Sequence, residues 1–304
     1  MTISGESKFD MPGIGEILAF LTAVVWAFAV ILFKKSGEQV HPLALNLFKN
    51  TFAFILFTIT LAISNEVFLY NAPSNEYWLM LVSGVIGIGI ADTLFFESLN
   101  RLGAGLTAIV DCLYSPFIIT LSFIFLGETM SIRQIIGAAM IISAILFTIQ
   151  AKEKLGISKK NLILGFTYGA LCHAFMAIGI VMIKPILDHS PILWTIEVRL
   201  IGGITFLLLY FAIHPKRNIF IRSLITKNRW SYTISGSFVG TYIATLIWLG
   251  GMKYTQASTA SALNQTSNIF LFILAAVFLK EKIDLRRTIA ILVAISGAFL
   301  IIFG

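Results

Sequence analysis

Three ionisable side chains stand deep inside long apolar stretches of this sequence: Asp92, Asp111 and His173. A charged group at the centre of a membrane-spanning helix costs roughly 2.5 to 3.5 kcal/mol on insertion scales, so each needs a specific reason to be there. Each could bind a polar solute or carry a proton, and histidine is the side chain whose charge changes near neutral pH. Structural alternatives stay open. Asp92 could form a buried ion pair with Lys49 or Arg199, and His173 could be a packing residue.

Uncharged polar residues recur at helical spacing in a later apolar stretch. They stand at i, i+3, i+4 and i+7, which gathers them on one face of a helix. In hydrocarbon such a face must meet a polar helix or a wet cavity. Side-chain hydrogen bonds between membrane helices stabilise the bundle by only about 0.6 kcal/mol on average. Because this is little compensation for burying four polar groups, we favour a cavity. These residues are Ser261, Asn264, Gln265 and Asn268.

Asp111 shares a helical face with Tyr114 and Ser115 by the same spacing. Pro116 lacks a backbone N–H and predicts a kink, which would help to form a cavity. Trp26 stands in the middle of an apolar stretch, where it either packs or offers a cation-π face. The predicted substrate-binding residues are Trp26, Asp92, Asp111, Tyr114, Ser115, His173, Ser261, Asn264, Gln265 and Asn268, and the proton-coupling candidates are Asp92, Asp111 and His173.

The composition indicates which elements must position these residues. Hydrophobic residues make up 58% and charged residues 12% of the 304 residues, and the mean hydropathy is +0.90. Charged residues are near a quarter of a soluble protein, so an ordinary soluble protein is excluded. Apolar runs of about twenty residues predict an all-α polytopic membrane protein. The ten predicted transmembrane helices are 14–33, 43–63, 77–98, 105–126, 132–150, 162–183, 193–213, 231–251, 258–279 and 287–303.

The charge distribution predicts the orientation. The net charge is +7, which in a membrane protein reflects basic loops, and we expect no nucleic-acid partner. Most of the 22 Lys and Arg residues fall on the side opposite the N-terminus. The positive-inside rule then predicts both termini outside the cytoplasm. The basic residues on the N-terminal side are Lys8, Arg133, Lys184 and Lys253.

The chain also indicates an internal repeat. Lys35 and Pro42 recur about 149 residues later as Lys184 and Pro191, and the pair at 83–84 recurs at 235–236. We therefore predict one five-helix repeat over 13–150 and a second over 162–304. Because five is odd, the second repeat must be inverted relative to the first, an organisation found in secondary transporters.

Short signatures support a family assignment. Phe-Leu-Gly-Glu ends at Glu128 and Phe-Leu-Lys-Glu ends at Glu281, and an arginine follows each, Arg133 and Arg286. With the two five-helix halves, this pattern resembles the EamA-like family of the drug/metabolite transporter superfamily. The resemblance implies a secondary carrier, usually an exporter of amino acids or other small metabolites, and both termini inside. Glu128 and Glu281 are interpreted as structural marks at helix ends.

Two main function classes compete, and a channel is a third possibility, although a channel would not by itself call for an inverted repeat. The first is a secondary transporter, a probable exporter of a small polar metabolite, which alternates access around a midplane site between the repeats. The alternative is a polytopic membrane enzyme acting on a lipid. Such enzymes usually need clustered carboxylates or metal-spaced histidines, and the sequence has no such motif, so we expect no enzyme, cofactor or metal. The expected partners are a small-molecule substrate and the lipid bilayer of the cell membrane. The oligomeric state stays open, a monomer included.

Overall fold

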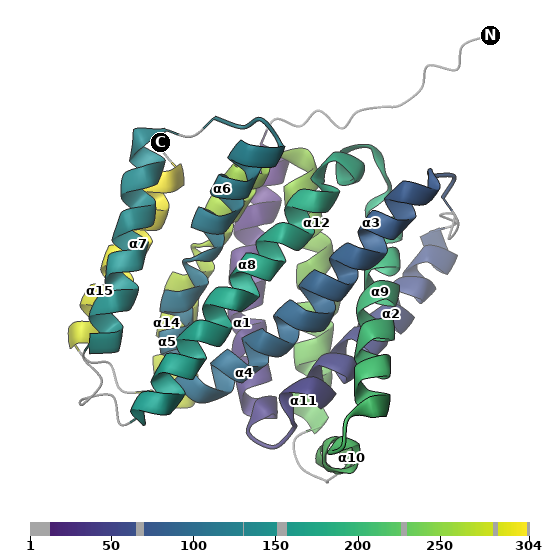
Figure 1. Ribbon diagram of the computed structural model, residues 1–304, viewed down its shortest axis with the longest axis horizontal. Coiled ribbons are helices and arrows are strands. Elements are labelled where there is room, and N and C mark those ends of the chain that lie inside the picture. Colours follow the sequence, from purple (N-terminus) through teal and green to yellow (C-terminus); the bar gives the residue numbers. More distant parts are fainter. Residues whose placement is uncertain are drawn as a thin grey trace.

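The computed structural model describes residues 13–64, 70–129, 131–150, 157–225, 230–281 and 285–302, and its regular elements there are all helices (Figure 1). Seven of the described helical segments are long and apolar enough to cross a membrane, and two shorter helices are also apolar. Every predicted span coincides with a helix or a run of helices. The uninterrupted ones are α1 (Ile14–Gly37), α2 (Pro42–Ser64), α7 (Ile132–Gln150), α8 (Lys159–His189), α9 (Ile192–Ile213) and α15 (Leu285–Ile302).

Two spans change from α-helix to π-helix and back. The π segments, η1 (Val85–Ala91) and η3 (Ser237–Ile243), stand 152 residues apart, the offset at which the sequence of this region recurs. π segments are uncommon and often mark functional positions. The inverted relation between the halves stays a prediction. The flanking helices are α3 (Ser74–Gly84), α4 (Asp92–Leu102), α11 (Trp230–Gly236) and α12 (Ala244–Tyr254).

Two other spans are interrupted near their middle. The first is broken between Asp111 and Tyr114, a few residues before Pro116. Pro116 thus lies in the first turn of the new helix, where its missing N–H costs nothing. The second break lies between Asn264 and Ser267. The four short helices are α5 (Ala104–Asp111), α6 (Tyr114–Phe125), α13 (Ala257–Asn264) and α14 (Ser267–Leu279).

Glycines bring the third span into backbone contact with α9. A Cβ on Gly84 would lie 1.9 Å from the carbonyl oxygen of Arg199, and one on Gly202 would lie 2.2 Å from that of Leu81. No larger residue fits at either position, because real Cβ contacts are longer than this. The close approach fixes how α9 is aligned beside η1, and this alignment positions the functional side chains that both segments carry.

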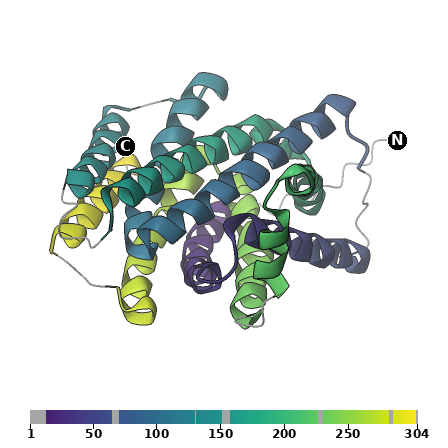
Figure 2. The ribbon, with the colours of Figure 1, turned by 60° about the horizontal axis from the view of Figure 1, so that its bottom comes forward.

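The remaining elements cover this centre. α7 and α15 lie side by side at one edge of the bundle (Figures 1 and 2). α10 (Arg217–Ile225) is seen end-on in Figure 1, so it runs crosswise to the long helices. Large apolar side chains such as Ile55, Phe125 and Ile213 are exposed on the outside. An exposed apolar surface of this kind suits a lipid environment.

Candidate functional site

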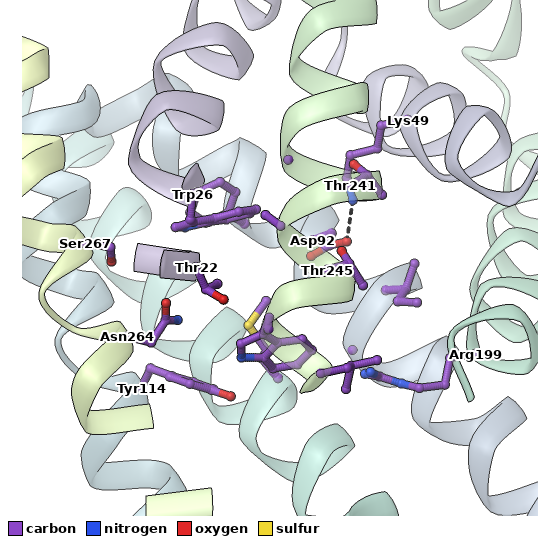
Figure 3. Close-up of a pocket in the computed structure, with 18 of the residues that line it drawn as sticks. Thr22, Trp26, Lys49, Asp92, Tyr114, Arg199, Thr241, Thr245, Asn264 and Ser267 are labelled. Atoms are coloured by element: carbon purple, nitrogen blue, oxygen red, sulfur yellow. Dashed lines mark hydrogen bonds and ion pairs between the residues drawn. The ribbon is translucent and has the colours of Figure 1, made fainter. Parts of the chain in front are cut away.

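A cavity lies at the centre of the described bundle, with an empty volume of about 1040 Å³ that partly opens to solvent (Figure 3). Its walls come from both halves of the chain, and both π segments contribute, through Gly87 and Gly240. Aromatic side chains form much of the apolar wall. Of the predicted substrate-binding residues, those that line the cavity are Trp26, Asp92, Asp111, Tyr114, His173, Asn264 and Gln265.

Asp92 forms a buried ion pair with Lys49. The Lys49 Nζ lies 2.7 Å from Asp92 Oδ2 and also donates to Asn50 Oδ1 at 3.2 Å. Asn50 in turn donates to the side chain of Asn46 at 2.7 Å, so a polar network runs along α2. Asp92 Oδ1 accepts no hydrogen bond from the described residues and remains available to a ligand. Of the two partners that the sequence left open, the structure selects Lys49.

Asp111 and His173 form a second pair on another wall. His173 Nε2 lies 2.8 Å from Asp111 Oδ1, and both side chains are buried. Gln265 Nε2 donates to the Asp111 backbone oxygen at 3.2 Å, and Asn268 Nδ2 donates to Gln265 Oε1 at 2.6 Å. The network therefore joins α5 to α8 and to the break between α13 and α14. His173 is held by a carboxylate rather than packed only among apolar groups.

Three predicted site residues lie outside the cavity wall. Ser115 and Ser261 are fully buried, and Ser261 Oγ donates to the Ser258 backbone oxygen at 2.8 Å. Asn268 is also buried and reaches the cavity only through its hydrogen bond to Gln265. For Ser115 and Asn268 the reason is local, because a helix break separates them from Asp111 and Asn264 and the regular spacing assumed from the sequence does not continue across it. Ser261 lies in α13 together with Asn264, one turn before the residues that line the cavity. A direct substrate contact for these three stays a prediction.

Arg199 is a cavity residue that the predicted site did not include. Its Nε donates to Ser83 Oγ at 3.1 Å, and its guanidinium carbon lies 5.8 Å from the Trp248 ring centre. Glu197, two residues away on α9, does not pair with it and instead accepts from Thr58 at 3.1 Å. The signal was present in the sequence, since an arginine inside an apolar span needs a partner. The cavity is also lined by uncharged polar residues that the sequence analysis did not assign to the site: Thr22, Asn50, Thr241, Thr245 and Ser267.

The family signature at Glu281 has a structural role. Its carboxylate accepts from the Ala104 N–H at 2.8 Å and from the Gly105 N–H at 3.0 Å, which caps the first turn of α5. The free N–H groups at a helix start favour a negative partner. This supports the interpretation of Glu281 as a mark at a helix end, away from the cavity.

The comparisons with known proteins decide the family. The model of the EamA-like transporter family matches residues 13–150 and again residues 163–303. The chain belongs to the EamA-like transporter family. An uncharacterized transporter of Archaeoglobus fulgidus is 25% identical over 289 residues, 94% of this chain and 98% of its own length. The protein PecM of Dickeya dadantii is 22% identical over 75% of each chain.

The fold of this EamA-like transporter is also found among solved structures. A protein crystal structure matches with a TM-score of 0.69 over 94% of both chains, at 16% sequence identity. At that identity the likeness concerns the fold alone. Family and fold together make the chain an all-helical, multi-pass membrane transporter.

Proposed function

We propose that the protein is a secondary active transporter that exports a small polar metabolite across the cell membrane by alternating access. The observation that carries the proposal is the central cavity, whose polar walls come from both halves of the chain. Secondary carriers bind their solute near the midplane, where discontinuous helices expose backbone groups to it. Here two π segments and two broken helices meet around the cavity.

The two carboxylate pairs give the cavity its proposed chemistry. Asp92 and Asp111 are each held by a basic side chain, Lys49 and His173. A proton that binds to or leaves His173 changes the charge of the second pair from within the wall, and a solute entering the cavity experiences that change. Asp92, Asp111 and His173 therefore remain the proton-coupling candidates.

The test uses the purified full chain in liposomes. A metabolite panel is first screened by thermal shift, and each stabilising compound is then tested for counterflow. A carrier gives saturable counterflow, in which unlabelled solute on one side drives labelled solute toward it. A channel gives flux without counterflow, and the membrane-enzyme alternative gives chemical change of a lipid without solute flux.

A matched pair of variants ties the flux to the cavity. We expect Asp92→Asn to abolish counterflow while the protein still reaches the membrane. Glu97→Gln is the control. Glu97 lies on the same helix as Asp92, but it does not line the cavity and pairs with Arg101 at 3.1 Å. Equal flux in the wild type and Asp92→Asn would refute this role for Asp92.

A further inference from the structure

The described ionisable groups of the cavity wall do not all pair with one another. Lys49 is paired with Asp92, and His173 is paired with Asp111. Arg199 is left over, because no described carboxylate lies within 4.0 Å of its guanidinium. When His173 carries a proton, the wall therefore holds one positive charge more than its carboxylates can neutralise.

Arg199 is also deeply buried. Its exposed fraction is 3%, and one of its five N–H groups, the Nε donor, is satisfied by Ser83 Oγ at 3.1 Å. The Ser83 hydroxyl in turn donates to the Gly179 backbone oxygen at 2.6 Å, so it is held in place, but it offers the guanidinium no negative charge. A buried charge without a partner is strongly unfavourable, and an ionisable residue inside a membrane span is by default a candidate for the functional site. The guanidinium prefers planar, two-oxygen partners such as carboxylates.

The surroundings hold the guanidinium toward the cavity. Gly87 leaves room for it, since a Cβ there would lie 3.2 Å from Arg199 Nη2. The Trp248 ring covers the group at 5.8 Å. Figure 3 shows Arg199 reaching the cavity from the side opposite Tyr114, with Trp26 above. A ligand bound to Arg199 would thus place its body among aromatic side chains.

We propose that Arg199 binds a negatively charged group of the transported solute, and that the substrate is an organic carboxylate with an apolar or aromatic body. The inference rests on the proposed transport function and specifies its substrate class. A purely cationic solute is disfavoured, because both described cavity carboxylates already have basic partners and the solute would meet an unpaired guanidinium.

The first test needs no ligand. We expect Arg199→Gln to leave the melting temperature of the ligand-free protein unchanged or higher, because no carboxylate loses its partner. Lys49→Gln is the matched comparison and should lower it, since Asp92 would then be left unpaired. A loss of stability in Arg199→Gln as large as that in Lys49→Gln would overturn the proposal by showing a structural role.

The second test compares probes of the same shape and different charge at constant ionic strength. The two sets are benzoate, benzamide and benzylamine, and phenylalanine, phenylalaninamide and phenethylamine. We expect a probe that bears a carboxylate to raise the melting temperature, while the amide and the amine of its set, which lack a carboxylate, do not. Its apparent Kd should weaken at least about tenfold in Arg199→Gln, the cost of a lost charge-assisted bond, and less in Arg199→Lys. Arg101→Gln, at a surface ion pair, should bind as the wild type does.

Several results would overturn the proposal: amides or amines that bind as tightly as carboxylates, unchanged carboxylate binding in Arg199→Gln, or no carboxylate probe that binds the wild type. Should Arg199→Gln fail to accumulate, Gly87→Ala provides a second test, because its methyl group would lie 3.2 Å from Arg199 Nη2, must shift the guanidinium by a few tenths of an ångström and should weaken carboxylate binding. The transport proposal is separable. Saturable counterflow of a cationic solute would support the transport function and reject the anion site at Arg199. Carboxylate binding without solute flux would support the anion site and reject the transport function.

Discussion

His173 Nε2 and Asp111 Oδ1 lie 2.8 Å apart, although the two residues come from different halves of the sequence. The contact joins α8 to α5 at the wall of the cavity. In the proposed transport cycle, a proton at this pair would act on an interaction between the halves as well as on the solute in the cavity. This is the arrangement expected of a group that couples protonation to a change of access.

The role of the Asp111–His173 pair in proton coupling can be tested by measuring solute exchange and gradient-driven solute transport separately. We expect Asp111→Asn and His173→Gln to retain counterflow but to lose solute accumulation driven by a pH gradient, because neither variant can exchange a proton within the pair. The measurement is labelled solute flux in liposomes with and without the gradient. Unimpaired gradient-driven accumulation in both variants would exclude the pair from coupling.

Lys49 and Asp92 should behave as a mutually dependent pair. Because Lys49 is only 5% exposed, removing one partner leaves a buried charge, and we expect Lys49→Met or Asp92→Asn to cost about 3 kcal/mol. The double variant should cost clearly less than the sum of the two. Unfolding of the purified proteins measures the cycle, and additive losses would mean that the ion pair contributes nothing to stability.

Gly127 and Lys280 occupy corresponding helix ends and share a left-handed backbone, with φ of 70° and 54°. This conformation costs a residue with a side chain roughly 1 kcal/mol or more, whereas glycine adopts it freely. We expect Lys280→Gly to stabilise the protein and Gly127→Ala to destabilise it, by about 1 kcal/mol each. Unfolding midpoints check both, and a loss of stability in Lys280→Gly would mean that its side chain makes compensating contacts.

His41 lies in the loop between α1 and α2, where its ring packs 4.2 Å from the Phe220 ring of α10. Burial lowers the pKa of His41 below its ordinary value of 6.5; Glu97 opposes the shift, while His214 and Lys216 add to it. The folded state thus binds fewer protons than the unfolded state in this range. The contribution of His41 to stability is therefore fully present above about pH 6.5, and it is lost as the pH falls through the lowered pKa of the folded state.

Replacing His41 should remove this part of the pH dependence. We expect His41→Asn to show a smaller fall in melting temperature than the wild type between pH 7.5 and pH 5. His189→Gln is the control, since His189 is a largely exposed histidine paired with Glu76 in another part of the surface. Identical falls in the wild type and His41→Asn would contradict the assignment.

Orientation has a direct test. The basic residues near the end of α1, the start of α8 and along α10 lie on one side of the predicted topology, which places that side in the cytoplasm. A reporter that is active only outside the cytoplasm should therefore be active when fused after Gly304. Activity of a cytoplasm-only reporter at the same position would reverse the orientation and agree with the family resemblance.

The sequence predicted what depends on composition and near neighbours. The spans follow from the length of the apolar runs. The choice of Lys49 over Arg199 as the partner of Asp92 could not be predicted, because it depends on the glycine contact that aligns α9 beside η1. Ser115 and Asn268 were assigned to the cavity by a regular helical spacing that the breaks before them interrupt.

The cap of Glu281 on α5 has a kinetic consequence. If alternating access moves the end of α14 away from the start of α5, two hydrogen bonds to a charged group must break, each worth about 1.5 to 3 kcal/mol. Once the face is open, water can take over both the carboxylate and the freed N–H groups. Because those energies are already net of competition from water, the cap favours the closed state of this face, and under the proposed transport cycle we expect Glu281 to affect the rate of opening while the cavity determines affinity for the solute.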